Sequence, residues 1–299
     1  MTKPRVSLAF PCYQQQAYVQ AALSSVLAQT YSPLQIVISD DASTDGTYDI
    51  VVEETSKYRG PHSIKVHRNT SRMGIENYNR LMEMAEGDFV VMAHSDDIAL
   101  PHRTQRLVEA WQRHGVSLVS SNSQLIDKAG KPLRLYLDPK DTEAIDLQWM
   151  ITTGSSPKLV GSALAWDREV FDRFGPLNHA RSAICTDWIL PFRATLLRGV
   201  HYICEPLMML RIHDESRAYK FLFNTGDQTA ISESDMANRT TQFVYMLETL
   251  QAFERENHDS RWKAVRAQLV RSIMQSTINW TTTRNQLMAQ GRIYKWSQP

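Results

Sequence analysis

The stretch DFVVMAHSDD, residues 88–97, joins a short apolar run to two adjacent carboxylates. The run from Phe89 to Ala93 predicts a buried β-strand, because a brief apolar segment bounded by a glycine and polar residues is typical of one. Asp96 and Asp97 then follow at the carboxyl end of that strand. Two like charges raise each other's proton affinity there unless a cation, hydrogen-bond donors or water compensates them. A plain turn is the simpler alternative, since Asp and Ser often bond their own backbone in turns.

The segments around this strand alternate between strand-like and helix-like patterns. Strands are predicted at 6–10, 35–39, 64–67 and 117–121, and helices at 15–29, 46–58, 75–85 and 103–114. Alternation at this spacing predicts an α/β fold with a mostly parallel sheet flanked by helices. Ligands of such sheets bind beyond the carboxyl ends of the strands, so the polar residues there are the first candidates for chemistry.

Three of the strand ends carry informative residues, which are PCY at 11–13, DDASTDG at 40–46 and HSDD at 94–97. No GxGxxG follows the first strand and no GxxxxGK[ST] occurs anywhere in the sequence, so neither common glycine-rich phosphate cradle is present. A phosphate bound at this edge would need another source of positive charge. A divalent cation held by the carboxylates supplies it.

The pattern changes after about Lys131. We expect a strand at 161–166, a short helix at 168–174, an amphipathic helix at 187–197 and two short strands at 200–203 and 207–212. A polar loop at about 214–232 follows, and the remainder is helical in pattern.

The composition excludes several classes of protein. A net charge of +1 gives no global electrostatic case for a nucleic-acid partner. Three scattered cysteines, Cys12, Cys185 and Cys204, argue for reduced thiols and against a disulfide framework or a structural zinc site. The N-terminal apolar run is too short for a signal peptide, and no segment approaches the length of a spanning helix. We therefore expect a cytoplasmic protein that can still lie peripherally on the inner face of the plasma membrane.

Five blocks in order and spacing resemble the family 2 inverting glycosyltransferases with the GT-A fold. They are VSLAFPCYQQQAYVQAALSSVLAQTY, IVISDDASTDGT with NTSRMGIENYNRLMEMAEGDFVVMAHSDD, LVGSALAWDREVFDRFGPLN, TDWILPFRATLLRG and PLMMLRIHDES. The resemblance runs from about Val6 to Ser216 and implies a Rossmann-like catalytic domain at 1–216. Residues 1–125 would bind the nucleotide-sugar, 126–216 would form the acceptor side, and 217–299 would be a C-terminal helical extension.

The resemblance implies a cation site and a catalytic base. Asp97 corresponds to the family's metal ligand for Mn²⁺ or Mg²⁺, and His213 to a histidine that can complete the metal or diphosphate shell. Asp187 corresponds to the base that takes the acceptor hydroxyl's proton. Read without the family, Asp187 is a helix N-terminal residue favoured by the dipole and His213 a solvated strand-end histidine.

The resemblance also implies a nucleotide pocket. Asp41 would bond the base edge, Pro11 and Tyr13 would line the nucleoside pocket, and Asp96 would contact the ribose or the metal shell. Arg72 is a candidate contact of the diphosphate. Packing alone would also explain Tyr13.

Two positions depart from the family pattern. The family often has an acid where His94 stands, and a Glu where Thr186 precedes the proposed base. An imidazole can ligate Mn²⁺, yet His94 can also be a mere spacer. The position of Asp187 is unaffected.

Residues 260–299 carry seven basic residues and no acidic one. Apolar residues are interleaved with them, among them Trp262, Leu269 and Ile278. A basic amphipathic helix with tryptophans is typical of an interface helix on anionic lipid. The alternative is a helix packed on the catalytic domain or on a second subunit, as in a homodimer.

The leading hypothesis is a metal-dependent inverting hexosyl- or N-acetylhexosaminyltransferase. Its donor would be a nucleotide-sugar, expected to be a UDP-sugar, and its acceptor a saccharide or lipid-linked saccharide in bacterial surface polysaccharide synthesis, such as that of O-antigen. One alternative is a degenerate nucleotide-sugar-binding assembly subunit without activity. Another is a sugar nucleotidyltransferase, which would be expected to carry a glycine-rich basic N-terminal loop that FPCYQQQAY lacks.

Overall fold

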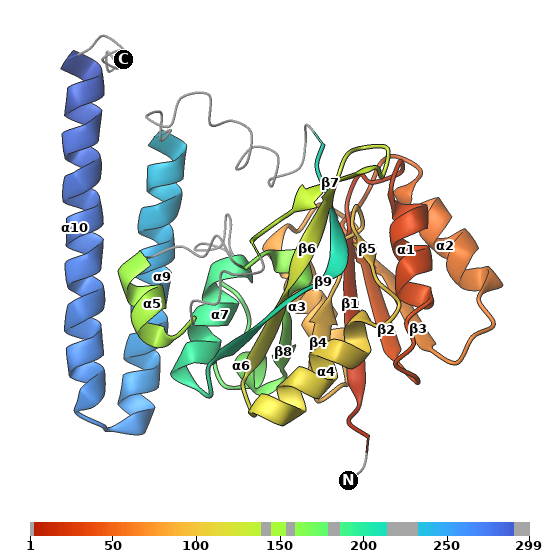
Figure 1. Ribbon diagram of the computed structural model, residues 1–299, viewed down its shortest axis with the longest axis horizontal. Coiled ribbons are helices and arrows are strands. Elements are labelled where there is room, and N and C mark those ends of the chain that lie inside the picture. The colour runs from red at the N-terminus through yellow and green to blue at the C-terminus, as the bar shows by residue number, and fades with distance from the viewer. Residues whose placement is uncertain (1–2, 139–144, 154–158, 179–185, 214–232, 290–299) are drawn as a thin grey trace.

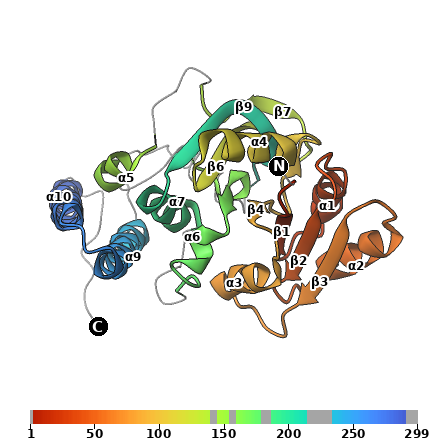
Figure 2. The ribbon, with the colours of Figure 1, turned by 90° about the horizontal axis from the view of Figure 1, so that it is seen from below.

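The structure is a computed structural model that describes residues 3–138, 145–153, 159–178, 186–213 and 233–289. Within these residues a single nine-stranded sheet runs through the molecule, with helices on both sides (Figures 1 and 2). Its strand order is β3-β2-β1-β4-β8-β6-β9-β5, and β7 pairs with β6.

The first half of the sheet is parallel, as the alternating pattern predicts. β1 pairs with β2 on one side and with β4 on the other, and β2 pairs with β3. The elements of this half are β1 (Val6–Cys12), α1 (Val19–Leu27), β2 (Gln35–Asp40), α2 (Thr47–Lys57), β3 (Ser63–Arg68), α3 (Ile75–Met84) and β4 (Phe89–Met92).

The second half adds antiparallel neighbours, so the sheet as a whole is mixed. β8 runs antiparallel to both β4 and β6, whereas β6 and β9 are parallel. The elements are β5 (Ile98–Ala99), α4 (Arg103–His114), β6 (Leu118–Ile126), β7 (Pro132–Leu135), α5 (Leu147–Thr153), the 3₁₀ helix η1 (Gly161–Ala163), β8 (Ala165–Asp167), α6 (Glu169–Asp172), α7 (Thr186–Leu196) and β9 (Val200–Arg211).

Several expected elements differ from the sequence pattern. The first helix begins at Val19, because the N–H groups of Gln14, Gln15 and Gln16 are bonded to side chains of the loop at 43–47. The strand expected at 161–166 is η1 followed by β8. The two strands expected at 200–203 and 207–212 are one strand, β9, whose register against β6 shifts around Asn122. The polar loop at 214–232 lies outside the described residues.

The core lies on both faces of the sheet because alternate residues of each strand point to opposite sides. Leu8 and Phe10 of β1 belong to a buried cluster that includes α1 and α4. Ala9 belongs to the other cluster, which includes α3, α7 and the C-terminal helices. Cys12 and Cys204 are free thiols, as the scattered cysteines predict, and Cys185 lies outside the described residues.

Two long helices, α9 (Glu233–Asn257) and α10 (Arg261–Ala289), form a hairpin beside α7 and α5 (Figure 1). The buried Arg193 of α7 donates to the carbonyl of Gly175 at 2.8 Å and to the Tyr245 hydroxyl of α9 at 3.1 Å. Phe253, Trp262 and other apolar residues of the hairpin join the same core cluster as α7. A domain division at residue 216 stays a prediction.

None of the described helices has an apolar run long enough to span a membrane.

Gly87 sets the close approach of β4 to β1. Its N–H donates to the Ser7 hydroxyl at 2.8 Å, and a Cβ added there would lie 2.4 Å from the Ser7 backbone nitrogen. Only a glycine fits this contact, which aligns the start of β4 with its neighbour. The residues that follow β4 therefore depend on it for their position.

We expect Gly87→Ala to lower the free energy of unfolding by about 1–3 kcal/mol, the usual cost of overpacking a tight contact. Urea unfolding followed by circular dichroism measures it. The control is Gly46→Ala, whose methyl group would meet only the flexible end of the Gln16 side chain, 3.0 Å away. Equal stability of the two variants would contradict the role given to Gly87.

Candidate active site at the carboxyl edge of the sheet

The parallel pairing of β1, β2 and β4 brings the residues that follow these strands to the same edge of the sheet, where the strands have their carboxyl ends. Cys12 at the end of β1 lies opposite Asp40 at the end of β2. Tyr13 and Asp41 follow directly after β1 and β2, and the turn at 94–97 begins two residues after the end of β4. Since ligands of such sheets bind at this edge, the strand ends define the candidate site.

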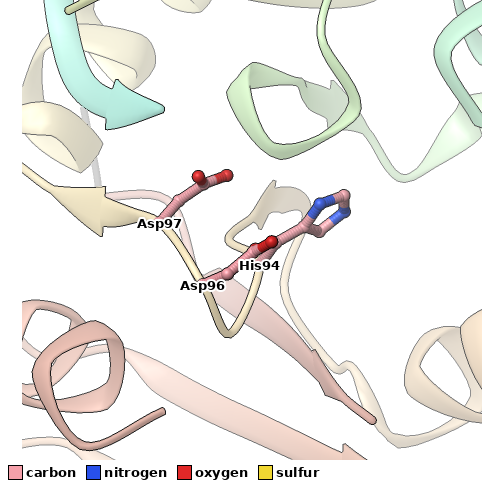
Figure 3. Close-up of side chains that lie close together, drawn as sticks. All are labelled: His94, Asp96 and Asp97. Atoms are coloured by element: carbon pink, nitrogen blue, oxygen red, sulfur yellow. The ribbon is translucent and has the colours of Figure 1, made fainter. Parts of the chain in front are cut away.

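The turn between β4 and β5 carries a potential cation site. One ligand atom each of His94, Asp96 and Asp97 can be chosen so that all lie within 4.8 Å of one another. Figure 3 shows the three side chains leaving this turn. Carboxylate oxygens suit Mg²⁺ and Mn²⁺, and an imidazole nitrogen suits Mn²⁺. These three side chains therefore offer ligand atoms that suit a divalent cation. The group includes His94, for which the sequence allowed either a role as a metal ligand or no role beyond that of a spacer.

The two carboxylates differ in proton affinity. Burial raises the pKa of Asp97 well above its usual value, and the adjacent charge of Asp96 raises it further. Burial also acts to raise the pKa of Asp96, but the hydrogen bond from His213 and the charges of His94 and His213 outweigh it and lower that pKa. Nε2 of His213 lies 3.2 Å from Oδ2 of Asp96. The structure thus places His213 directly against Asp96.

Arg211, which sequence reasoning missed, closes the site from β9. Its backbone N–H donates to Asp97 Oδ1 at 2.9 Å, and its Nε donates to the Asp96 carbonyl at the same distance. Its guanidinium lies 4.8 Å from the ring centroid of Tyr18. The available signal was its position two residues before His213.

Arg103 of α4 was also missed. It is buried, and its Nη2 donates to the carbonyl of Ser162 in η1 at 2.7 Å. Burial lowers the pKa of Arg103 to about 10, although the nearby charge of Asp97 acts in the opposite direction. A buried arginine behind a buried aspartate supplies part of the positive charge that the turn needs.

Asp41 holds the loop that carries Arg72. Its carboxylate accepts from the backbone N–H groups of Met73 at 2.7 Å and Gly74 at 2.9 Å, and from the Asn69 amide at 2.9 Å. The guanidinium of Arg72 lies 4.4 Å from the ring centroid of Tyr13. Tyr13 and Arg72 therefore lie together just beyond the end of β1, the strand that contains Pro11. A contact of Asp41 with a base edge stays a prediction.

Asp187 lies in the first turn of α7, where the sequence places it. The Thr186 hydroxyl donates to its Oδ1 at 3.0 Å, and a Cβ added to Gly161 would lie 2.4 Å from the same oxygen. Burial, assisted by the charge of Asp187, raises the pKa of Tyr136 to about 12. η1 thus contacts Asp187 through Gly161 and Arg103 through Ser162. Residues 179–185, which precede this helix in the sequence, lie outside the described residues.

With this geometry in view, the similarity to known proteins becomes informative. Residues 7–173 match glycosyl transferase family 2, and the chain belongs to this family. It is therefore a glycosyltransferase by family, as the sequence blocks predict.

Two relatives extend the match. An uncharacterized glycosyltransferase of Nostoc sp. is 27% identical over 247 residues, which cover 80% of this chain and 74% of that protein. A putative teichuronic acid biosynthesis glycosyltransferase of Bacillus subtilis, TuaG, is 26% identical over 144 residues, which cover 48% of this chain and 56% of that protein.

Two solved structures share the fold. TarS 1–349 of S. aureus, in complex with UDP-GlcNAc, superposes with a TM-score of 0.58 at 17% identity, covering 97% of this chain and 93% of that one. The mannosyltransferase PcManGT of Pyrobaculum calidifontis, in complex with GDP-Man and Mn²⁺, gives a TM-score of 0.55 at 17% identity, covering 100% and 89%. The GT-A fold expected from the sequence is confirmed.

The pKa of Asp96 is lowered and that of Asp97 is raised, so the variants Asp96→Asn and Asp97→Asn should change the stability of the folded state in opposite directions. A raised pKa means that the folded state favours protonated Asp97, so its contribution to stability is lost as pH rises through that raised value. The lowered pKa of Asp96 means that its contribution is present above the usual carboxyl pKa and lost as pH falls through the lowered value.

Without added metal at neutral pH, we expect Asp97→Asn to raise the melting temperature and Asp96→Asn to lower it, each by about 2–4 °C. Differential scanning fluorimetry measures both shifts. Shifts of the same sign would contradict the asymmetry described for the turn.

Proposed function

We propose that this protein is a metal-dependent inverting glycosyltransferase. It transfers a sugar from a UDP-sugar to a saccharide or lipid-linked saccharide acceptor. The observation that carries the proposal is a carboxylate turn whose ligand atoms could hold a cation, together with a separate carboxylate, Asp187, which lies against Gly161 of η1. A hexosyl- or N-acetylhexosaminyltransferase fits this arrangement.

Asp97, Asp96 and an imidazole from His94 or His213 would hold Mn²⁺ or Mg²⁺. When bound, the cation stabilises the negative charge of the departing nucleoside diphosphate. The protein's own contribution is to keep Asp96 ionised through His213 and to hold Asp97 against the Arg211 backbone. The Mn²⁺ in the PcManGT complex supports this proposal.

The donor nucleoside would lie against Pro11 and Tyr13, with Arg72 available to the diphosphate. The cation–π contact between Arg72 and Tyr13 presents a positive charge and an aromatic face together. Asp41 acts here by anchoring the loop of Arg72, and its own contact with the base is part of the proposal. The UDP-GlcNAc of the TarS complex supports a UDP-sugar donor.

Asp187 would accept the proton of the acceptor hydroxyl while that oxygen attacks the anomeric carbon. A single displacement with one base inverts the configuration at that carbon. Gly161 leaves room for the carboxylate, and the Thr186 hydroxyl orients it. Thr186 stands where the family often has Glu, and its hydroxyl donates to Asp187.

The acceptor is proposed to belong to bacterial surface polysaccharide synthesis, and the name of the relative TuaG supports this. A lipid-linked acceptor would bring the protein to the inner face of the plasma membrane. Self-association as a homodimer is a separate proposal that light scattering tests.

The donor site is tested by thermal shift with UDP, GDP, CDP and dTDP, each with and without Mn²⁺. A ligand at a hundredfold excess over its Kd stabilises the folded state by about 2.7 kcal/mol. We expect a shift for UDP that requires Mn²⁺ and is absent in Asp97→Ala. No shift with any nucleotide would favour a degenerate subunit without transferase activity.

The base is tested by product analysis once the donor is known. We expect Asp187→Asn to keep the nucleotide shift and to lower kcat by about 10²- to 10⁴-fold. Gly161→Ala should also lower kcat, by about tenfold to a hundredfold, because its methyl group displaces the carboxylate. The control Asp172→Asn removes an exposed carboxylate of α6 and should leave kcat unchanged. A product with the donor's anomeric configuration would contradict inversion.

A further inference from the structure

The outer face of α10 carries an exposed apolar stripe. Val270, Met274 and Ile278 are 37%, 58% and 55% exposed. They are spaced four residues apart, so they lie on one side of the helix and extend along about 12 Å of it. The other large apolar residues that are exposed in the described chain, such as Val66 and Leu133, do not form such a row. The row therefore differs from ordinary scattered surface residues.

The inner face of α10 is already occupied. Trp262 and Leu269 are buried in the core cluster shared with α7 and α9, and Val265 and Ile273 pack against it. Figures 1 and 2 both place α10 at the edge of the molecule, with α9 and α5 on the side toward the sheet. The apolar residues of the helix thus divide into a packed face and an exposed stripe, which the sequence pattern could not separate. The side chain of Trp280 and residues 290–299 lie outside the described part.

The charge around the stripe is positive. α10 contains five basic residues and no acidic one. Arg261 pairs with Asp259 at 2.9 Å and Arg266 with Glu254 of α9 at 3.4 Å. Lys263 and Arg271 are exposed and form no ion pair with any described residue. By their spacing these two side chains lie on the same outer side as the stripe.

We propose that this face, defined by Lys263, Val270, Arg271, Met274 and Ile278, binds an anionic lipid surface. The apolar side chains would enter the boundary between headgroups and acyl chains, and the two cations would meet lipid phosphates. A second copy of α10 is the less suitable partner because it would bring the same positive charges into contact. The stripe is short, so binding depends on the electrostatic attraction and weakens with salt.

The proposal is tested by flotation of the full chain with phosphatidylcholine vesicles, with and without phosphatidylglycerol. We expect binding only to vesicles that contain phosphatidylglycerol, and loss of most of it between about 0.1 and 0.5 M salt. The double variants Met274→Ser/Ile278→Ser and Lys263→Glu/Arg271→Glu should each bind about tenfold more weakly. The matched control Val66→Ser/Leu133→Ser removes exposed apolar side chains elsewhere and should bind like the wild type.

Three outcomes would overturn the proposal. They are no binding of the wild type, equal binding of the α10 variants and the wild type, and a dimer in light scattering that the α10 variants convert to a monomer without any vesicle binding. Melting temperatures within about 1 °C of the wild type show that the exposed substitutions leave the fold intact. The assay needs neither nucleotide nor metal, so its result is independent of the donor-site test.

Discussion

The placement of a buried carboxylate, Asp97, beside the half-buried Asp96 just after β4 is the constraint on which this site depends. Burial and the adjacent charge of Asp96 both raise the pKa of Asp97, and the groups that oppose these effects come from distant parts of the chain. The charge of Arg103 comes from α4, the backbone N–H of Arg211 from the end of β9, and His213, which contacts Asp96, from the residues after that strand. The return of β9 to this edge of the sheet thus brings Arg211 and His213 into contact with the turn.

The parallel half of the fold could be predicted because its signals are local. Apolar runs, helical spacing and polar strand ends each lie within a few residues, and α4 was predicted at its observed bounds, Arg103–His114. The continuous strand β9 was not predicted, because the sequence around Pro206 indicates the end of one strand and the start of another. In the structure the pairing with β6 continues past Pro206 through a shift in register. The inner and outer faces of α10 were not separable either, since apolar spacing does not reveal what a face meets.

The sequence named candidate site residues but not the groups that they contact. The roles of Asp97, Asp187 and His213 stay predictions, and Arg103 was expected only as the first residue of the helix at 103–114. Its contact with Ser162 spans 59 residues, and that of Arg211 with Asp97 spans 114. Such pairs depend on how the sheet is assembled, which no local pattern encodes. Asp41 illustrates the same limit, because its oxygens meet a loop some thirty residues away.

Helix α7 connects the candidate active site with the C-terminal helical hairpin. Asp187 is in its first turn, and Arg193, held by Tyr245 of α9, is six residues further on, about 9 Å along the axis. Pro191 lies between these two residues and removes one backbone hydrogen bond from the helix. The helix that carries the proposed base is therefore held at Arg193 by its contact with α9, and the position of Asp187 depends in part on how the α9–α10 hairpin packs.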